Sequence, residues 1–125
     1  MKVAVTATGL SLDSSIDPRF GRCRYFVIVE TDDMTFEAIE NANSALGGGA
    51  GIQSGQLVAH QGVTAVLTGN CGPNAHQTLS AAGINVIVGC SGTVAESVER
   101  FKAGELSATS TPNVPNHSGM EGALK

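Results

Sequence analysis

Aromatic side chains and positive charges are both scarce in this chain of 125 residues. Trp is absent and aromatic residues make up 4% of the chain, so aliphatic side chains must fill the core. Lys and Arg number seven against eleven Asp and Glu, and this net charge of −4 argues against binding to nucleic acid. No apolar run has the length needed to span a bilayer. These absences favour a single globular domain that binds neither nucleic acid nor a membrane.

Cysteines are few, and their number and spacing exclude two common roles. Three is an odd number, which favours reduced thiols or metal ligands over a disulfide framework. No two of them have Cys-x-x-Cys spacing, so a structural zinc site is not expected. The first residues, 1–5, lead directly into a strand pattern without signal-peptide architecture. We therefore expect a cytoplasmic protein.

Hydrophobic periodicity and glycine-rich turns predict an α/β fold with the element order β-β-β-α-β-α-β-α. The strands are expected at 2–6, 25–30, 35–40, 63–68 and 84–88, and the helices at 52–61, 73–82 and 94–103. A hairpin at Asp32-Asp33 should make the second strand antiparallel to its neighbours. The later βα units imply parallel strands. We expect one domain over residues 1–106 and a flexible tail over 107–125, where periodicity is lost.

Three loops should meet at one edge of this sheet, called the rim, where the first, fourth and fifth strands end. They are residues 17–23, 69–74 and 89–93, and each contains one cysteine. Ligands of open α/β sheets bind outside the carboxyl ends of strands, so three thiols at the rim point to a soft metal or a metal–sulfur cluster. Residues 47–51 also reach the rim. They lack the Lys and Ser/Thr of a Walker A loop, which leaves a flap or a plain turn.

Positive charge is concentrated at the same rim. Arg19, Arg22 and Arg24 lie close together in a chain with few cations, which indicates a local anion site. Three helices are expected to start at the rim and would add N–H donors for an anion. The alternative is a solvated loop in which the arginines pair with Asp13 or Asp17.

The thiols and imidazoles leave two interpretations open. Cys71 is the best candidate ligand because it precedes a helix N-terminus, where a thiolate is stabilised. Cys90 is placed similarly, whereas Cys23 is expected to point into the core. His76, in the first turn of a helix, and His117, in the tail, are further candidates. In the alternative interpretation the cysteines are small buried hydrophobic residues.

Taken together, these motifs resemble the NifX/NifB C-terminal family of dinitrogenase iron–molybdenum cofactor biosynthesis proteins, which includes the orange-protein subgroup. The matching segments are Phe20-Gly21-Arg22, residues 48–53, Gly72-Pro73-Asn74-Ala75, Ala82-Gly83-Ile84 and Ser91-Gly92-Thr93-Val94. They lie in the family order over residues 1–106. The resemblance implies a ribonuclease-H-like, three-layer α/β/α domain with a five-stranded mixed sheet whose second strand is antiparallel.

The resemblance also implies a carrier or scaffold with an anionic metal–sulfur cluster at the rim. From their place at the rim and in the matching motifs, the residues expected to bind it are Arg19, Phe20, Gly21, Arg22, Gly48, Gly49, Gly51, Asn70, Cys71, Gly72, Asn74, His76, Ser91, Gly92 and Thr93. Cys71, Cys90 and Cys23 are candidate metal ligands by position alone, since many family members have small apolar residues there. Molybdenum–copper sulfide is favoured, since orange proteins hold such a cluster without a covalent link. An iron–sulfur cluster or an iron–molybdenum precursor is the alternative. We expect a monomer whose partners are cluster-assembly proteins, among them a P-loop ATPase.

An enzymatic role has little support in the sequence. A ribonuclease-H-like nuclease needs clustered carboxylates on its strands to hold two metal ions, and residues 2–6 contain none. Cys71 and His76 could form a thiol dyad, but no third residue is evident to orient them. We therefore favour a non-enzymatic carrier. The alternative is an adaptor for a cluster-assembly or ParA/MinD-type ATPase complex, without a cluster of its own.

Overall fold

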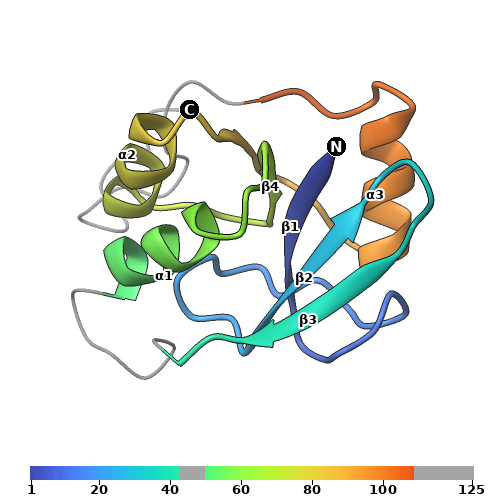
Figure 1. Ribbon diagram of the computed structural model, residues 1–125, viewed down its shortest axis with the longest axis horizontal. Helices are drawn as coiled ribbons and strands as arrows, with labels where there is room; N and C mark the ends of the chain where they lie inside the picture. Colours follow the sequence, from blue (N-terminus) through green and yellow to red (C-terminus); the bar gives the residue numbers. More distant parts are fainter. Residues whose placement is uncertain (43–49, 109–125) are drawn as a thin grey trace, which may run out of the picture.

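The computed structural model describes residues 1–42 and 50–108, and it contains the predicted elements in the predicted order (Figure 1). They are β1 (Lys2–Ala7), β2 (Tyr25–Glu30), β3 (Phe36–Glu40), α1 (Ala50–Ala59), β4 (Ala65–Leu67), α2 (Pro73–Ala81), β5 (Asn85–Ile87) and α3 (Val94–Lys102). Gly48, Gly49 and most of the expected tail, from residue 109 on, lie outside the described residues.

The five strands form one mixed sheet in the order β3-β2-β1-β4-β5. Strand β2 is antiparallel to both of its neighbours, whereas β1, β4 and β5 are parallel. The predicted reversal of the second strand is therefore confirmed. Because of it, the start of β2 lies beside the end of β1, where Tyr25 pairs with Ala7. The long loop between these strands, residues 8–24, consequently begins and ends at the rim.

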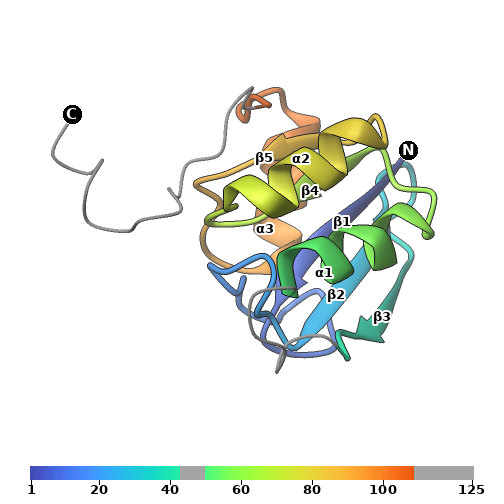
Figure 2. The same cartoon turned by 90° about the vertical axis from the view of Figure 1, so that its left-hand side faces the viewer.

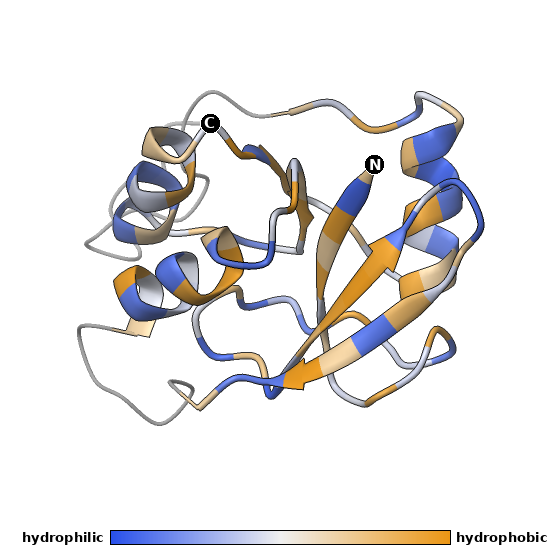
Figure 3. Ribbon diagram, viewed as in Figure 1, coloured by the Kyte–Doolittle hydropathy of each residue, from blue (hydrophilic) through white to orange (hydrophobic). Residues whose placement is uncertain are grey.

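Helices cover both faces of the sheet, so the domain has three layers, α/β/α. Helices α1 and α2 lie on one face and α3 on the other (Figures 1 and 2). Alternate residues of each strand serve the two cores. Along β1, for example, Ala4 joins the core under α1 and α2, whereas Val3 and Val5 join the core under α3. A sheet covered on both faces needs hydrophobic strands, and β2 is hydrophobic over most of its length (Figure 3).

Glycines on α1 allow α2 to pack very close to it. A Cβ atom at Gly55 would lie 2.8 Å from Cγ2 of Thr78, and one at Gly51 would lie 3.4 Å from Cβ of Ala75. Gly51 and Gly55 are four residues apart and therefore share one face of the helix. This close contact brings the first turns of both helices together at the rim (Figure 2).

Element ends differ from the prediction by a few residues. Helix α1 begins two residues earlier than expected, at Ala50, and β4 and β5 are shorter than their apolar runs. Across the two described ranges, no helix combines the length and apolarity that a membrane crossing requires.

Candidate functional site

Backbone hydrogen bonds hold the loop 8–24 across the rim. The N–H of Ile16 donates to the carbonyl of Gly92 (2.9 Å), and that of Phe20 donates to the carbonyl of Asn70 (3.2 Å). These bonds connect the loop to the turns that follow β5 and β4. The Phe20-Gly21-Arg22 motif is thereby fixed beside the start of α2, far away in the sequence.

Asp17 and Arg19 form a local turn within this loop. The Asp17 carboxylate accepts a hydrogen bond from the backbone N–H of Arg19 (3.0 Å), and its Oδ1 lies 3.6 Å from Nε of the same residue. Asp17 is buried and Arg19 is exposed. The expected alternative, pairing of an arginine with Asp17, therefore holds for Arg19 and partly neutralises its charge. In the described ranges, no ion pair involves Arg22.

A cavity of about 310 Å³ opens at the rim between this loop, the turn after β4 and the starts of α1 and α2. It is lined by Arg19, Phe20, Gly21, Arg22, Ala50, Gly51, Asn70, Gly72, Pro73, Asn74 and Ala75. The wall residues comprise two arginines, two asparagines, and glycines and apolar residues. No carboxylate, thiol or imidazole is among the lining residues in the described part of the chain.

Eight of the residues expected at the site line this cavity. The structure brings together Arg19, Phe20, Gly21, Arg22, Gly51, Asn70, Gly72 and Asn74. Ala50, Pro73 and Ala75 also line it, and the sequence interpretation missed them. These residues could have been found from their position, because each lies in the first turn of a helix next to residues that were expected at the site.

Other expected residues lie apart from the cavity. Ser91, Gly92 and Thr93 precede α3 on the opposite face of the sheet, and none of them lines it. Thr93 has a helix-capping role: its hydroxyl accepts from the N–H of Glu96 (3.1 Å), and the Glu96 carboxylate accepts from the N–H of Thr93 (2.9 Å). His76 is buried, with Nδ1 3.4 Å from the hydroxyl of Ser80, and it does not line the cavity either.

The three cysteines do not meet. Cys23 and Cys71 are buried in the core under α1 and α2, whereas Cys90 is buried in the core under α3. Within residues 1–42 and 50–108, no group of three or more His, Cys, Asp or Glu side chains could hold a metal ion. The expectation that three thiols converge on one metal is therefore wrong, because the sheet separates Cys90 from the other two.

Burial also makes these thiols poor ligands at neutral pH. It raises the pKa of Cys71 to about 12, and burial together with the nearby Asp17 charge raises the pKa of Cys23 to about 12. The Cys23 thiol donates to the carbonyl of Phe20 (3.2 Å). The expectation of a stabilised thiolate at Cys71 is therefore wrong. Burial raises the pKa of this thiol more than the positive potential at the start of α2 could lower it.

Stability should fall in alkaline solution for the same reason. In the unfolded chain the thiols ionise near pH 9, whereas in the folded protein Cys23 and Cys71 stay protonated to about pH 12. The folded state therefore binds more protons in this range, and each thiol lowers the free energy of unfolding by up to about 1.4 kcal/mol per pH unit. Urea denaturation at about pH 8, 9 and 10 measures the slope. A Cys23→Ala, Cys71→Ala double variant should have a shallower slope, and an equal slope would contradict the assignment.

Known proteins resemble this one in sequence and in fold. The sequence model of a family described as dinitrogenase iron–molybdenum cofactor matches residues 1–104. An uncharacterised protein of Methanocaldococcus jannaschii is 33% identical over 110 residues, which cover 85% of this chain and 93% of the relative. The apo form of the orange protein from Desulfovibrio gigas has a TM-score of 0.87 and 43% identity, with 90% of this chain and 95% of that one covered. The NMR structure of a NifB-like protein from Thermotoga has a TM-score of 0.76 and 35% identity, with 90% and 97% covered. The chain therefore belongs to the dinitrogenase iron–molybdenum cofactor family, as its motifs predicted.

Proposed function

We propose that this protein is a non-enzymatic carrier that binds an anionic metal–sulfur cluster in the rim cavity. The observation that carries the proposal is the composition of the cavity wall, which offers positive charge and N–H donors but no thiol, imidazole or carboxylate among its described residues. A metal cluster held there would have to keep its own ligands, because no thiolate, imidazole or carboxylate of the described wall could replace them. The protein would hold it by charge, hydrogen bonds and shape.

The start of α2 supports an anionic ligand. Its N-cap residue, Gly72, has no side chain that could cap the helix, and Pro73 has no N–H, so the N–H groups of Asn74 and Ala75 are the donors of this first turn. The N–H groups of a first helical turn have no partner within the helix, and the helix dipole adds positive potential there. Such an end binds anions readily. Arg22, exposed on the opposite wall and without an ion pair among the described residues, supplies a full positive charge.

The apolar part of the wall favours an anion with sulfide ligands, such as a thiometallate, over an oxyanion. Phe20, Ala50, Pro73 and Ala75 offer no hydrogen bonds from their side chains to replace a tightly held water shell. Sulfide ligands are softer and less strongly hydrated than oxide ligands. A thiometallate therefore loses less hydration free energy than an oxyanion when it enters the cavity. We propose molybdenum–copper sulfide as the cluster, because the 43% identical neighbour is an orange protein, the subgroup for which the sequence resemblance implies it. Cluster-assembly proteins would load and unload it.

Anaerobic purification tests this proposal directly. The protein should carry a visible chromophore with metal and inorganic sulfide, or should acquire one when titrated with tetrathiomolybdate and Cu(I). Molybdate, which has the same charge and oxide ligands, should bind more weakly. Cys71→Ala and Cys90→Ala should retain the bound anion, since neither thiol lines the cavity. A colourless protein that binds neither anion would favour the adaptor alternative, and loss of binding in either cysteine variant would point to direct metal ligation.

A further inference from the structure

A buried polar cluster lies directly behind Arg22. It consists of Asn41, at the end of β3 and 2% exposed, and Ser54, on α1 and 0% exposed. The Asn41 side-chain amide donates to the carbonyls of Cys23 (2.9 Å) and Gly21 (3.3 Å). The Ser54 hydroxyl lies within hydrogen-bond distance of the Gly21 carbonyl (3.3 Å) and of Oδ1 of Asn41 (3.2 Å). The two residues thus bond the carbonyls on both sides of Arg22.

Burial of these groups needs an explanation. An amide or hydroxyl costs free energy when it leaves water, and aliphatic side chains of the same size would fill the space without that cost. What an aliphatic pair could not do is hold the two carbonyls in place. Asn41 is itself anchored, because its backbone N–H donates to the carbonyl of Arg24 (2.8 Å). The cluster therefore ties residues 21–24 to one strand and one helix.

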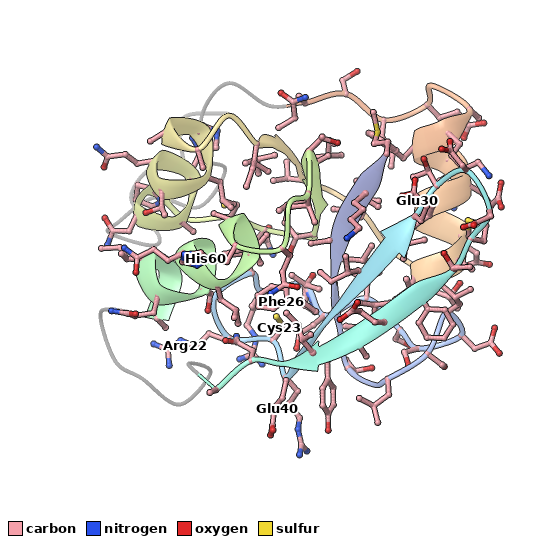
Figure 4. The ribbon with its side chains drawn as sticks, in the orientation of Figure 1. Arg22, Cys23, Phe26, Glu30, Glu40 and His60 are labelled. Carbon is pink, nitrogen blue, oxygen red and sulfur yellow. The ribbon has the colours of Figure 1, made fainter. Side chains whose placement is uncertain are left out.

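The local geometry makes the direction of the Arg22 side chain depend on this polar cluster of Asn41 and Ser54. Gly21 is pressed against the start of α1, where an added Cβ atom would lie 3.2 Å from the backbone of Gly51. In Figure 4, Cys23 lies in the interior near Phe26, whereas Arg22 points outward beside the start of α1. Rotation of this short segment would move the guanidinium group away from the cavity.

We propose that Asn41 and Ser54 are positioning residues that fix the direction in which Arg22 faces the cavity. This inference rests on the proposed function, because it assigns to Arg22 an anionic ligand in that cavity. Neither residue touches the cavity itself, since neither is among its lining residues. Their effect on binding must therefore pass through the backbone of residues 21–23.

A double-mutant cycle with tetrathiomolybdate as the probe tests the assignment. Ser54→Ala should weaken binding by about two- to tenfold, the range for one lost neutral hydrogen bond. In an Arg22→Ala background the same change should have no further effect. Ser97→Ala is a matched control, since Ser97 is also 0% exposed on a helix and donates to a loop carbonyl, that of Ser91 (3.2 Å), on the opposite face. It should leave the affinity unchanged.

A measurement on the ligand-free protein separates this inference from the proposed function. Ser54→Ala should speed amide hydrogen exchange at residues 21–23, while Ser97→Ala should not. Unchanged exchange there, or an equal loss of affinity with and without Arg22, would overturn the positioning role. A different result is that the unmodified protein fails to bind tetrathiomolybdate while amide exchange is still faster in Ser54→Ala. That result would overturn the proposed function but would support the role of Ser54 in holding residues 21–23.

Discussion

Replacing Arg22 with alanine is expected to weaken tetrathiomolybdate binding by about tenfold or more. The guanidinium group lines the cavity and makes no ion pair within the described ranges, so its charge is available to a ligand. A charge-assisted hydrogen bond contributes about 1.5–3 kcal/mol. Arg19→Ala should have a smaller effect, because Asp17 already lies 3.6 Å from its guanidinium. Absorbance titration at low salt measures both changes.

Lys102→Ala is the control for this experiment. It also removes one positive charge, but Lys102 ends α3, on the opposite face of the sheet from α1 and α2. Binding should change little, since salt largely screens a surface charge that lies on the other side of the domain from the cavity. If Lys102→Ala weakened binding as much as Arg22→Ala, the effect would come from net charge alone, and the cavity would lose its role.

Phe20→Ala should cause a large loss of stability, about 3–5 kcal/mol in the free energy of unfolding. Phe20 is 2% exposed, and the centroid of its ring lies 5.4 Å from that of Phe26. Few other aromatic residues share the work of filling this core, since the chain has four Phe, one Tyr and no Trp. Removal of the ring leaves a void between the loop 8–24 and the sheet. Urea denaturation monitored by circular dichroism gives the change.

Phe36→Ala is the matched control, because the same side chain on β3 is 43% exposed. It buries much less apolar surface, so its loss should cost no more than about 1 kcal/mol. Similar losses in the two variants would mean that the packing of the loop 8–24 contributes little to stability. Domains of this size have only about 5–15 kcal/mol of stability in total, so Phe20→Ala should be studied at low temperature.

The fold could be predicted because its determinants are local. Short hydrophobic runs identify the strands, glycines follow the helix ends, and the turn at Asp32-Asp33 makes β3 antiparallel to β2. Thr93 and Glu96 have the Ser/Thr-x-x-Glu spacing of a capping box, and α3 does begin directly after Thr93. Strand ends were less accurate: Val63 is apolar and buried, yet β4 begins at Ala65. Burial continues past the point where regular strand pairing stops.

The sequence predicted the site residues that the backbone fold alone brings to the cavity. It did not predict those whose role depends on the direction of the side chain. Glycine-rich turns at the rim located the cavity wall, because position in the fold alone brings them there. The directions of Cys71 and Cys90 could not be predicted, since strand alternation does not extend into loops. Asn41 and Ser54 were missed for another reason: their partners are carbonyls in a distant loop, and such contacts leave no pattern in the sequence.

The close contact between α1 and α2 limits the size of any ligand that can enter the cavity. Gly51 and Ala75 both line the cavity, and they are also the residues through which the first turns of the two helices meet. The width of the opening is therefore set by glycines at the helix contact, including Gly55, which never reaches the cavity. A methyl group added at Gly55 would push α1 and α2 apart and widen the opening, while every lining residue stayed the same. The size of ligand that a cavity of this kind admits is therefore decided partly by residues outside its wall.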